Sequence, residues 1–215
     1  MKRGHNLFAI YKTLNAHFGD LNWWPGNSPF EVIVGAILTQ NTAWRNVEKA
    51  IDRLKSKKLL HPARILEIDD STLADLIRPA GYYNIKTQRL KSFIRFLYDE
   101  YSGKLDNMFV EDLWCLRTKL LTVKGIGEET ADSILLYAGR KPIFVVDTYT
   151  RRVLQRHDII CSDATYKDIQ NLLMTHLPHS VSLYNQYHAL FVNTGKLFCA
   201  KNPRCDGCPL QSQVY

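Results

Sequence analysis

Residues 121–131 read Leu-Thr-Val-Lys-Gly-Ile-Gly-Glu-Glu-Thr-Ala, and this stretch decides how the chain folds around it. Gly125 and Gly127 interrupt a helical pattern there. Apolar residues recur at helical spacing on both sides of the stretch, at Leu113, Leu116, Leu120, Ile134 and Leu135. Glycine tolerates backbone angles that side chains resist, and it lets another molecule approach the bare backbone closely. The stretch therefore predicts a tight turn between two packed helices.

A turn of this kind, at the start of a helix, can also bind an anion. The first N–H groups of a helix have no partner within the helix and point away from its end. With Lys124, Gly125, Ile126 and Gly127 in the turn, the pattern resembles a helix-hairpin-helix, which holds a DNA phosphate without reading base sequence. The glycines alone fit a plain turn between packed helices equally well.

Helical periodicity extends over nearly the whole chain. Ser28, Pro29 and Glu31 predict a capped helix start, and the helix that follows is apolar nearly all round, which is typical of a buried central helix. Further apolar stripes lie at 47–54, 73–77, 90–101, 169–177 and 184–191. Residues 143–146 fit a buried strand, but no partner strand is evident. The predicted fold class is all-α.

Composition narrows the class of protein. A chain of 215 residues can bury a core as one domain or as two lobes that share a cleft. Its 28 Lys and Arg against 21 Asp and Glu give a net charge of +7, which favours a polyanionic partner. No apolar run approaches the ~20 residues of a membrane span. Without an export signal we expect a cytoplasmic protein, associated with the nucleoid, whose five cysteines are thiols or metal ligands.

Four ordered motifs resemble those of the endonuclease III superfamily of DNA glycosylases. Besides the hairpin they are Leu38-Thr39-Gln40-Asn41-Thr42, Gly81-Tyr82-Tyr83-Asn84-Ile85-Lys86 and Val146-Asp147-Thr148. The resemblance spans about residues 28–210. It implies a central helical lobe over 26–138 that ends with the hairpin. A second lobe would combine 1–25 with 139–215, and the active cleft would lie between the two lobes.

The resemblance makes Asp147 the catalytic carboxylate. Loss of a base leaves a deoxyribose with oxocarbenium character, which a carboxylate can stabilise while it orients or deprotonates a water. Asp147 also stands where an N-cap is expected, directly before Thr148 and a helical run. We expect both roles at once.

The sequence departs from the strand-cleaving members of this superfamily at Glu129. Those enzymes carry a lysine there that attacks C1′ and forms a Schiff base. A carboxylate cannot form an imine, and Lys124 lies on the other side of the hairpin, where it is better placed to meet a phosphate. We therefore expect a monofunctional glycosylase whose AP lyase activity is weak or absent.

Tryptophans indicate the class of base. Trp23-Trp24-Pro25, together with Trp44 after the Thr42 loop, is similar to the endonuclease III-like 3-methyladenine DNA glycosylases. Indole faces attract cations by ~0.5–2 kcal/mol, and an alkylated purine is cationic. The resemblance thus implies a pocket for an alkylated purine. The alternative is that Trp23 and Trp24 are core or interface residues.

Eversion of a base leaves a hole in the duplex that side chains must fill. Tyr82 matches the superfamily's intercalating residue, and Gln40 or Asn41 would plug the space opposite the unpaired base. The alternative for Gln40 and Asn41 is helix C-terminal capping. Lys86 and Arg89 are interpreted as phosphate contacts or as part of a solvated helix face.

Cys199, Cys205 and Cys208 look like the superfamily's iron–sulfur loop, which uses four thiolates. The fourth ligand would fall at Val214, so a [4Fe–4S] cluster, a zinc ion and a metal-free loop all stay open, with the cluster ahead. None is needed for the chemistry. Cys115 and Cys161 are predicted to be buried thiols.

These residues together predict a monomeric DNA glycosylase of base excision repair that acts on damaged double-stranded DNA. Its substrate would be an alkylated purine. The alternatives are an endonuclease III-type or mismatch glycosylase and, from another class, a non-catalytic helix-hairpin-helix protein that only binds DNA.

Overall fold

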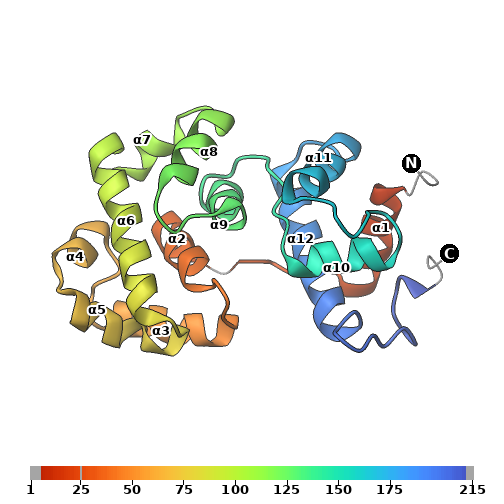
Figure 1. The fold of residues 1–215 in the computed structure, drawn as a ribbon, viewed down its shortest axis with the longest axis horizontal. Helices are drawn as coiled ribbons and strands as arrows, with labels where there is room; N and C mark the ends of the chain where they lie inside the picture. The colour runs from red at the N-terminus through yellow and green to blue at the C-terminus, as the bar shows by residue number, and fades with distance from the viewer. Residues whose placement is uncertain (1–5, 25, 212–215) are drawn as a thin grey trace. The chain divides into compact units, whose positions relative to one another are not determined.

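The computed structural model describes residues 6–24 and 26–211, and the regular structure of that part is helical throughout (Figure 1). The all-α prediction is confirmed. The chain forms two compact units, one from the described residues of Trp24–Lys141 and the other from those of Met1–Trp23 and Pro142–Tyr215. No helix within the described ranges is long and apolar enough to cross a membrane.

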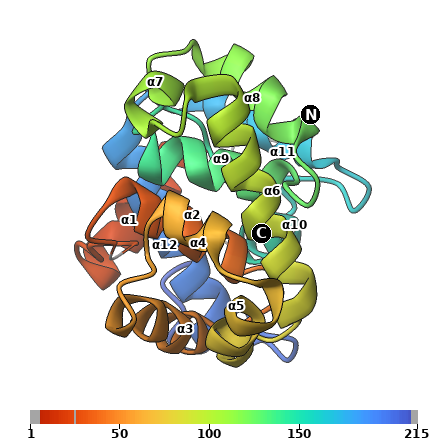
Figure 2. The ribbon, with the colours of Figure 1, turned by 90° about the vertical axis from the view of Figure 1, so that its left-hand side faces the viewer.

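The continuous unit is built around one buried helix, α2. The unit contains α2 (Pro29–Leu38), α3 (Trp44–Ser56), α4 (Pro62–Glu67), α5 (Asp70–Ile77), the 3₁₀ turn η1 (Arg78–Ala80), α6 (Tyr83–Tyr101), α7 (Leu105–Phe109), α8 (Leu113–Thr122), α9 (Glu128–Ser133) and the π-helical turn η2 (Ile134–Ala138). The α2 helix packs against α3, α6, α9 and η2, and α3 lies beside α5 in Figure 2.

The start of α2 follows from its sequence. The Ser28 hydroxyl accepts a hydrogen bond from the backbone N–H of Glu31 at 3.2 Å, and Pro29 occupies the first turn. Every residue from Phe30 to Leu38 is buried. The buried Glu31 carboxylate is paired with Lys55 at 2.6 Å, which satisfies the one charge in this apolar helix. The predicted capped central helix is confirmed.

The second unit combines α1 (Leu7–Phe18) with α10 (Thr148–Arg156), α11 (Tyr166–His176) and α12 (Val181–Leu197). Its core is aromatic: Phe144 makes edge contacts with Tyr184, Tyr187 and Phe191. The Tyr187 hydroxyl donates to the Leu7 carbonyl at 2.8 Å, which ties α1 to α12 across 180 residues of sequence.

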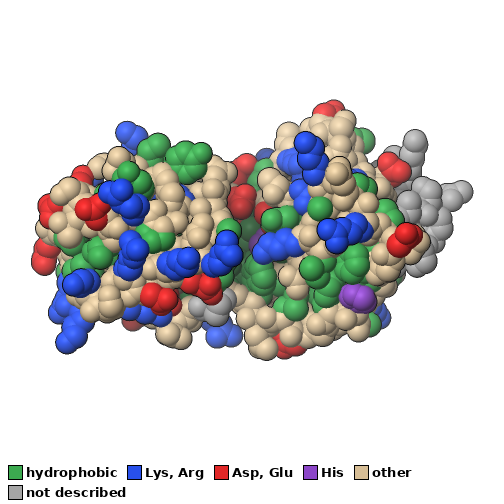
Figure 3. Space-filling model, turned by 90° about the horizontal axis from the view of Figure 1, so that it is seen from below, with side chains coloured by type: hydrophobic (Ala, Val, Ile, Leu, Met, Phe, Trp, Pro, Cys, Tyr) green, Lys and Arg blue, Asp and Glu red, His purple; other side chains and the backbone are tan. Residues whose placement is uncertain are grey.

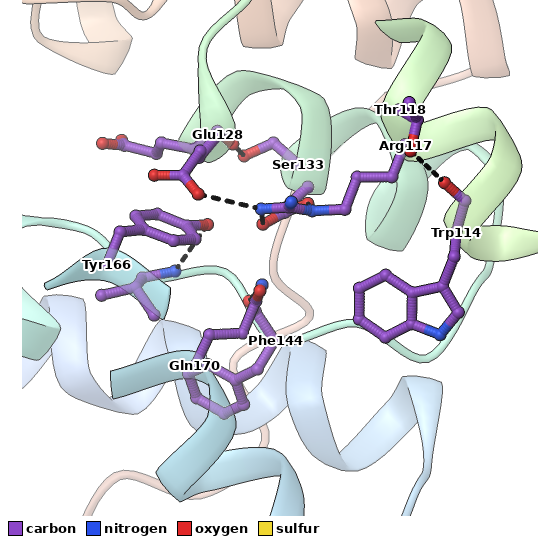
Figure 4. A network of polar contacts seen from close by, with 11 residues as sticks. Trp114, Arg117, Thr118, Glu128, Ser133, Phe144, Tyr166 and Gln170 are labelled. Atoms are coloured by element: carbon purple, nitrogen blue, oxygen red, sulfur yellow. Dashed lines mark hydrogen bonds and ion pairs between the residues drawn. The ribbon is translucent and has the colours of Figure 1, made fainter. Parts of the chain in front are cut away.

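Residues 143–146 are buried but form no strand, so that prediction was wrong. Their backbone groups find side-chain partners on α11 instead of a neighbouring strand. The Gln170 amide donates to the Phe144 carbonyl at 2.7 Å, and the Tyr166 hydroxyl accepts from the Val146 N–H at 3.3 Å (Figure 4). Apolar runs this short do not distinguish a strand from a buried connection.

Candidate active site

The two carboxylate oxygens of Asp147 have different neighbours. It is the N-cap of α10, and its Oδ1 accepts from the Thr150 N–H at 2.7 Å. Its Oδ2 lies 3.5 Å from His188 Nε2 on α12, and its side chain is only 10 % exposed. The capping interpretation is confirmed, and it leaves one oxygen for other work.

The surroundings of Asp147 favour its charged form. Burial on its own raises the pKa of this carboxyl, but the attraction of His188 and the hydrogen bonds from Thr150 outweigh burial, so the pKa lies below its ordinary value. Asp147 is therefore a carboxylate at neutral pH. In that state it can stabilise positive charge or accept a proton, and it cannot act as an acid.

Trp23 belongs to the same unit as Asp147. Its indole meets His188 edge to face, with ring centroids 6.2 Å apart, and the Lys196 ammonium lies 5.7 Å from the centroid of the Trp23 ring. The sequence places His188 in an apolar helical stripe, where nothing distinguishes it from a core residue. Its position beside Asp147 depends on the packing of α10 on α12.

Trp24 packs in the other unit. Its ring stacks on Tyr137, with centroids 4.6 Å apart and planes 8° apart, and lies 5.2 Å from Trp44. The positive φ of Trp24, 70°, is rare for a residue with a side chain and turns the chain sharply at this point. Trp24, Trp44 and Tyr137 thus form an aromatic cluster. Tyr137 falls in an apolar helical stretch of the sequence, where nothing indicates that it belongs to this cluster. Pro25 lies outside the described residues.

Trp44 is fixed on both sides. Gly35 on α2 makes room for its ring, because a Cβ at Gly35 would lie 3.2 Å from Trp44 Cη2. The indole N–H donates to the Glu48 carboxylate at 2.8 Å, one turn further along α3. This hydrogen bond fixes the orientation of the ring and brings a negative charge to its edge.

The C-terminal end of α2 is capped by Thr39 and not by the side chains of Gln40 or Asn41. The Thr39 hydroxyl donates to the Gly35 carbonyl. Gln40 reaches the hairpin instead: its Nε2 donates to the Gly125 carbonyl at 3.0 Å and to the Thr130 hydroxyl at 2.9 Å. Asn41 is exposed with φ of 53°. Tyr82 is 68 % exposed and is the N-cap of α6, with a φ of 46° that is uncommon for a residue with a side chain.

The hairpin has the predicted geometry. Gly125 takes a φ of 89°, and the Ile126 N–H closes the turn on the Val123 carbonyl at 3.0 Å. Ile126 is buried and anchors the turn, while Lys124 is exposed. Gly127 is the N-cap of α9, and a Cβ at this position would meet no atom within 4 Å. Both a packing turn and an open anion site are consistent with this arrangement.

Two glutamates, Glu128 and Glu129, open α9. Arg117 on α8 binds Asp132 at 2.7 Å and Glu128 at 3.4 Å, as Figure 4 shows for Glu128. Glu129, which the resemblance aligns with the Schiff-base lysine of the lyases, is exposed. The face in Figure 3 carries Lys and Arg side chains on both units, in keeping with the net charge of +7.

Two arginines of α10 hold the cysteine loop. Arg152 donates to the carbonyls of Cys199 and Gly195, at 2.6 and 3.1 Å. Arg156 donates to the Ala200 carbonyl at 2.6 Å and to Cys199 Sγ at 3.3 Å. In the part of the chain that the structure describes, no three His, Cys, Asp or Glu side chains lie close enough together to bind one metal ion. Val214 lies outside that part.

The remaining cysteines differ from their prediction. Cys115 on α8 and Cys161 after α10 are both exposed, so the expectation of buried thiols was wrong. Each sits beside apolar residues in sequence, but on the outer side of its segment.

The profile of HhH-GPD superfamily base excision DNA repair proteins matches residues 34–179. MJ1434 of Methanocaldococcus jannaschii, provisionally named a DNA repair glycosylase, is 46% identical over 207 residues, which cover 95% of this chain and 94% of that protein. Endonuclease III of Sulfolobus acidocaldarius is 33% identical over 183 residues, or 85% of this chain and 79% of the enzyme.

A solved structure is similar over nearly its whole length. The crystal structure of H. pylori 3-methyladenine DNA glycosylase, MagIII, bound to 1,N6-ethenoadenine, matches with a TM-score of 0.76 and 29% identity, and the match covers 89% of this chain and 98% of that one.

Proposed function

Because this chain belongs to the HhH-GPD superfamily and is a DNA glycosylase of base excision repair, we propose that its substrate is an alkylated purine such as 3-methyladenine. In this proposal the enzyme everts the damaged base from double-stranded DNA and removes it by hydrolysis. It works as a monomer in the cytoplasm, at the nucleoid. The aromatic cluster of Trp24, Trp44 and Tyr137 is the observation that carries the proposal.

The cluster suits a cationic aromatic ligand. A purine alkylated on a ring nitrogen carries positive charge, which the π face of an indole attracts. The Glu48 carboxylate at the N–H of Trp44 makes that face more negative and adds its own attraction. Stacking needs no specific hydrogen bond, so one cluster can accept several alkylated purines.

The relatives support two substrate classes. MagIII is named for 3-methyladenine and was crystallised with 1,N6-ethenoadenine, a purine adduct. The relative from Sulfolobus acidocaldarius is named endonuclease III, which keeps an endonuclease III-type activity as the second candidate. The tryptophans favour the first, because a neutral damaged pyrimidine gains less from an indole face than a cation does.

In the proposed mechanism Asp147 acts on the everted nucleotide as a carboxylate. It stabilises the positive charge that develops on the sugar and orients the attacking water. Alkylation already weakens the glycosidic bond, so the leaving base needs no strong acid. This fits a site whose principal acidic group is ionised at neutral pH. Lys124, Gly125, Ile126 and Gly127 would hold a phosphate beside the lesion.

A panel of duplex oligonucleotides tests the proposal. Each duplex carries one of 3-methyladenine, 7-methylguanine, 1,N6-ethenoadenine, thymine glycol, uracil or a T·G mismatch, and base release is scored before and after alkali. We expect the two cationic purines to be released fastest. Faster release of thymine glycol would establish the endonuclease III-type candidate instead.

Replacing Trp44 by alanine should lower kcat/KM for 3-methyladenine by about tenfold or more, because stacking on an aromatic ring supplies ~1–3 kcal/mol per base. Trp114→Ala is the matched control, since Trp114 is an exposed tryptophan of the same unit and lies on α8. We expect this control to change kcat/KM less than twofold. Equal effects of the two substitutions would remove Trp44 from the pocket.

The iron–sulfur cluster stays a prediction from the cysteine spacing, and elemental analysis tests it. Iron, zinc and acid-labile sulfide are measured in freshly purified protein, together with its visible absorption. A [4Fe–4S] cluster on Cys199, Cys205 and Cys208 predicts about four irons and four sulfides per chain. Fully active protein without iron would reject the cluster, and zinc in its place would establish the second option.

A further inference from the structure

The buried lysine of α6 links two loops that the sequence assigns to DNA. Lys86 is 1 % exposed, and its ammonium donates to the carbonyls of Leu38 and Ala80, each at 2.8 Å. Leu38 ends α2 directly before the loop of Gln40 and Asn41, and Ala80 ends η1 two residues before Tyr82. The interpretation of Lys86 as a phosphate contact or a solvated residue was therefore wrong.

Arg89, one helical turn further along α6, links the first of these loops to the hairpin. Its Nη1 donates to the side-chain oxygen of Gln40. The side-chain nitrogen of Gln40 in turn donates to the Gly125 carbonyl. Arg89 also packs across the hairpin, since a Cβ at Gly125 would lie 2.3 Å from Arg89 Cγ. The residues Lys86, Arg89 and Gln40, here called the α6 network, thus touch all three segments.

Stability alone does not account for the buried ammonium. Burial lowers the pKa of Lys86 to about 8, and the charge of Arg89 acts in the same direction. The charge is thus held at a cost. A methionine of similar length would fill the same space without that cost, but it would leave the two carbonyls without their donor. What the ammonium provides, and a methyl group cannot, is a fixed distance between the backbone carbonyls that end α2 and η1.

We propose that Lys86 and Arg89 are positioning residues for base eversion. The α6 network fixes the positions of the hairpin, the Gln40–Asn41 loop and Tyr82 relative to one another. The side chains that enter the duplex are thereby set at a defined distance from the phosphate that the hairpin grips. The proposal depends on these segments being the DNA-contacting ones, and it is independent of which base is removed.

The experiment compares Lys86→Met with Lys91→Met. Lys91 is a second buried lysine of α6, and its ammonium bonds the Ile68 carbonyl and pairs with Asp70 at 2.6 Å, so it holds no DNA-contacting loop. The probe is a duplex with a tetrahydrofuran abasic analogue and 2-aminopurine opposite it. Because this duplex has no base to remove, its result does not depend on the substrate preference.

We expect Lys86→Met to bind the probe at least tenfold more weakly than wild type. At saturating protein it should give less than half of the wild-type change in 2-aminopurine fluorescence. Lys91→Met should keep both values while losing a similar amount of thermal stability. The salt dependence of binding should be the same for all three proteins, because the phosphate contacts persist. A wild-type fluorescence change in saturated Lys86→Met, or an equal loss in Lys91→Met, would overturn the proposal.

A second variant serves if Lys86→Met does not fold. Arg89 is only partly buried, and Arg89→Met removes its bond to Gln40 without emptying the core. The fluorescence change at saturation should again fall by at least half. A folded Arg89→Met protein with the full wild-type change would overturn the proposal on its own.

Discussion

Asparagine at position 147 should lower the single-turnover rate of base release by about 10²- to 10⁴-fold, the range that a charged catalytic group contributes. The asparagine oxygen can still accept the Thr150 N–H that Asp147 now binds at 2.7 Å, so α10 keeps its cap. What is lost is the negative charge that would face the sugar. Rapid-quench measurement with excess enzyme separates this step from product release.

The control is another aspartate at the start of a helix. Asp69 caps α5 by accepting the Thr72 N–H at 2.9 Å, in the unit that lacks Asp147. Asp69→Asn should release base at the wild-type rate. Asp147→Asn should also keep its affinity for damaged DNA, which is the property that a pure DNA-binding protein would share. Turnover near wild type in Asp147→Asn would remove Asp147 from the mechanism.

Sodium borohydride should trap no covalent adduct between the wild-type protein and DNA. Trapping requires an amine that has formed a Schiff base with C1′, and Glu129 stands at the position that the resemblance to the lyases assigns to that lysine. The product should be an intact strand with an abasic site, cleaved only after alkali. Denaturing gels of the labelled strand and of the protein read both outcomes.

Two substitutions calibrate that result. Glu129→Lys should raise trapping from background to a clear adduct band, because it restores an amine at the matching position. Glu128→Lys places the same amine one residue earlier, at the position whose carboxylate now pairs with Arg117. This variant should leave trapping at background. A wild-type adduct as strong as that of Glu129→Lys would show a lyase, and equal bands from both lysine variants would show that position 129 has no special access.

Local rules predicted much of this structure. The Ser28 cap, the burial of α2, the left-handed Gly125 and the cap at Asp147 each depend on a few neighbouring residues. Hydrophobic periodicity and capping preferences operate at that range, so the sequence reveals them. The motifs that resemble known glycosylases are local in the same sense.

Features that depend on packing were missed. Tyr137 reaches Trp24 from the π-helical turn η2, whose wider winding departs from the regular helical period. Lys86 is buried because two carbonyls from different loops meet at its ammonium. Trp23 and Trp24 are consecutive in sequence, yet one packs beside His188 and the other on Tyr137. None of these partners is a sequence neighbour.

The division of the chain has a consequence for its biosynthesis. The unit of Trp24–Lys141 is continuous, so it can fold as soon as its last residue leaves the ribosome. Helix α1 is synthesised before this unit, but its apolar face rests on α11 and α12, which are synthesised after it. Until α11 and α12 are made, the side chains of Leu7, Ile10 and Leu14 are not buried against these helices. Helix α1 therefore reaches its packed position only after the whole of the Trp24–Lys141 unit has been synthesised.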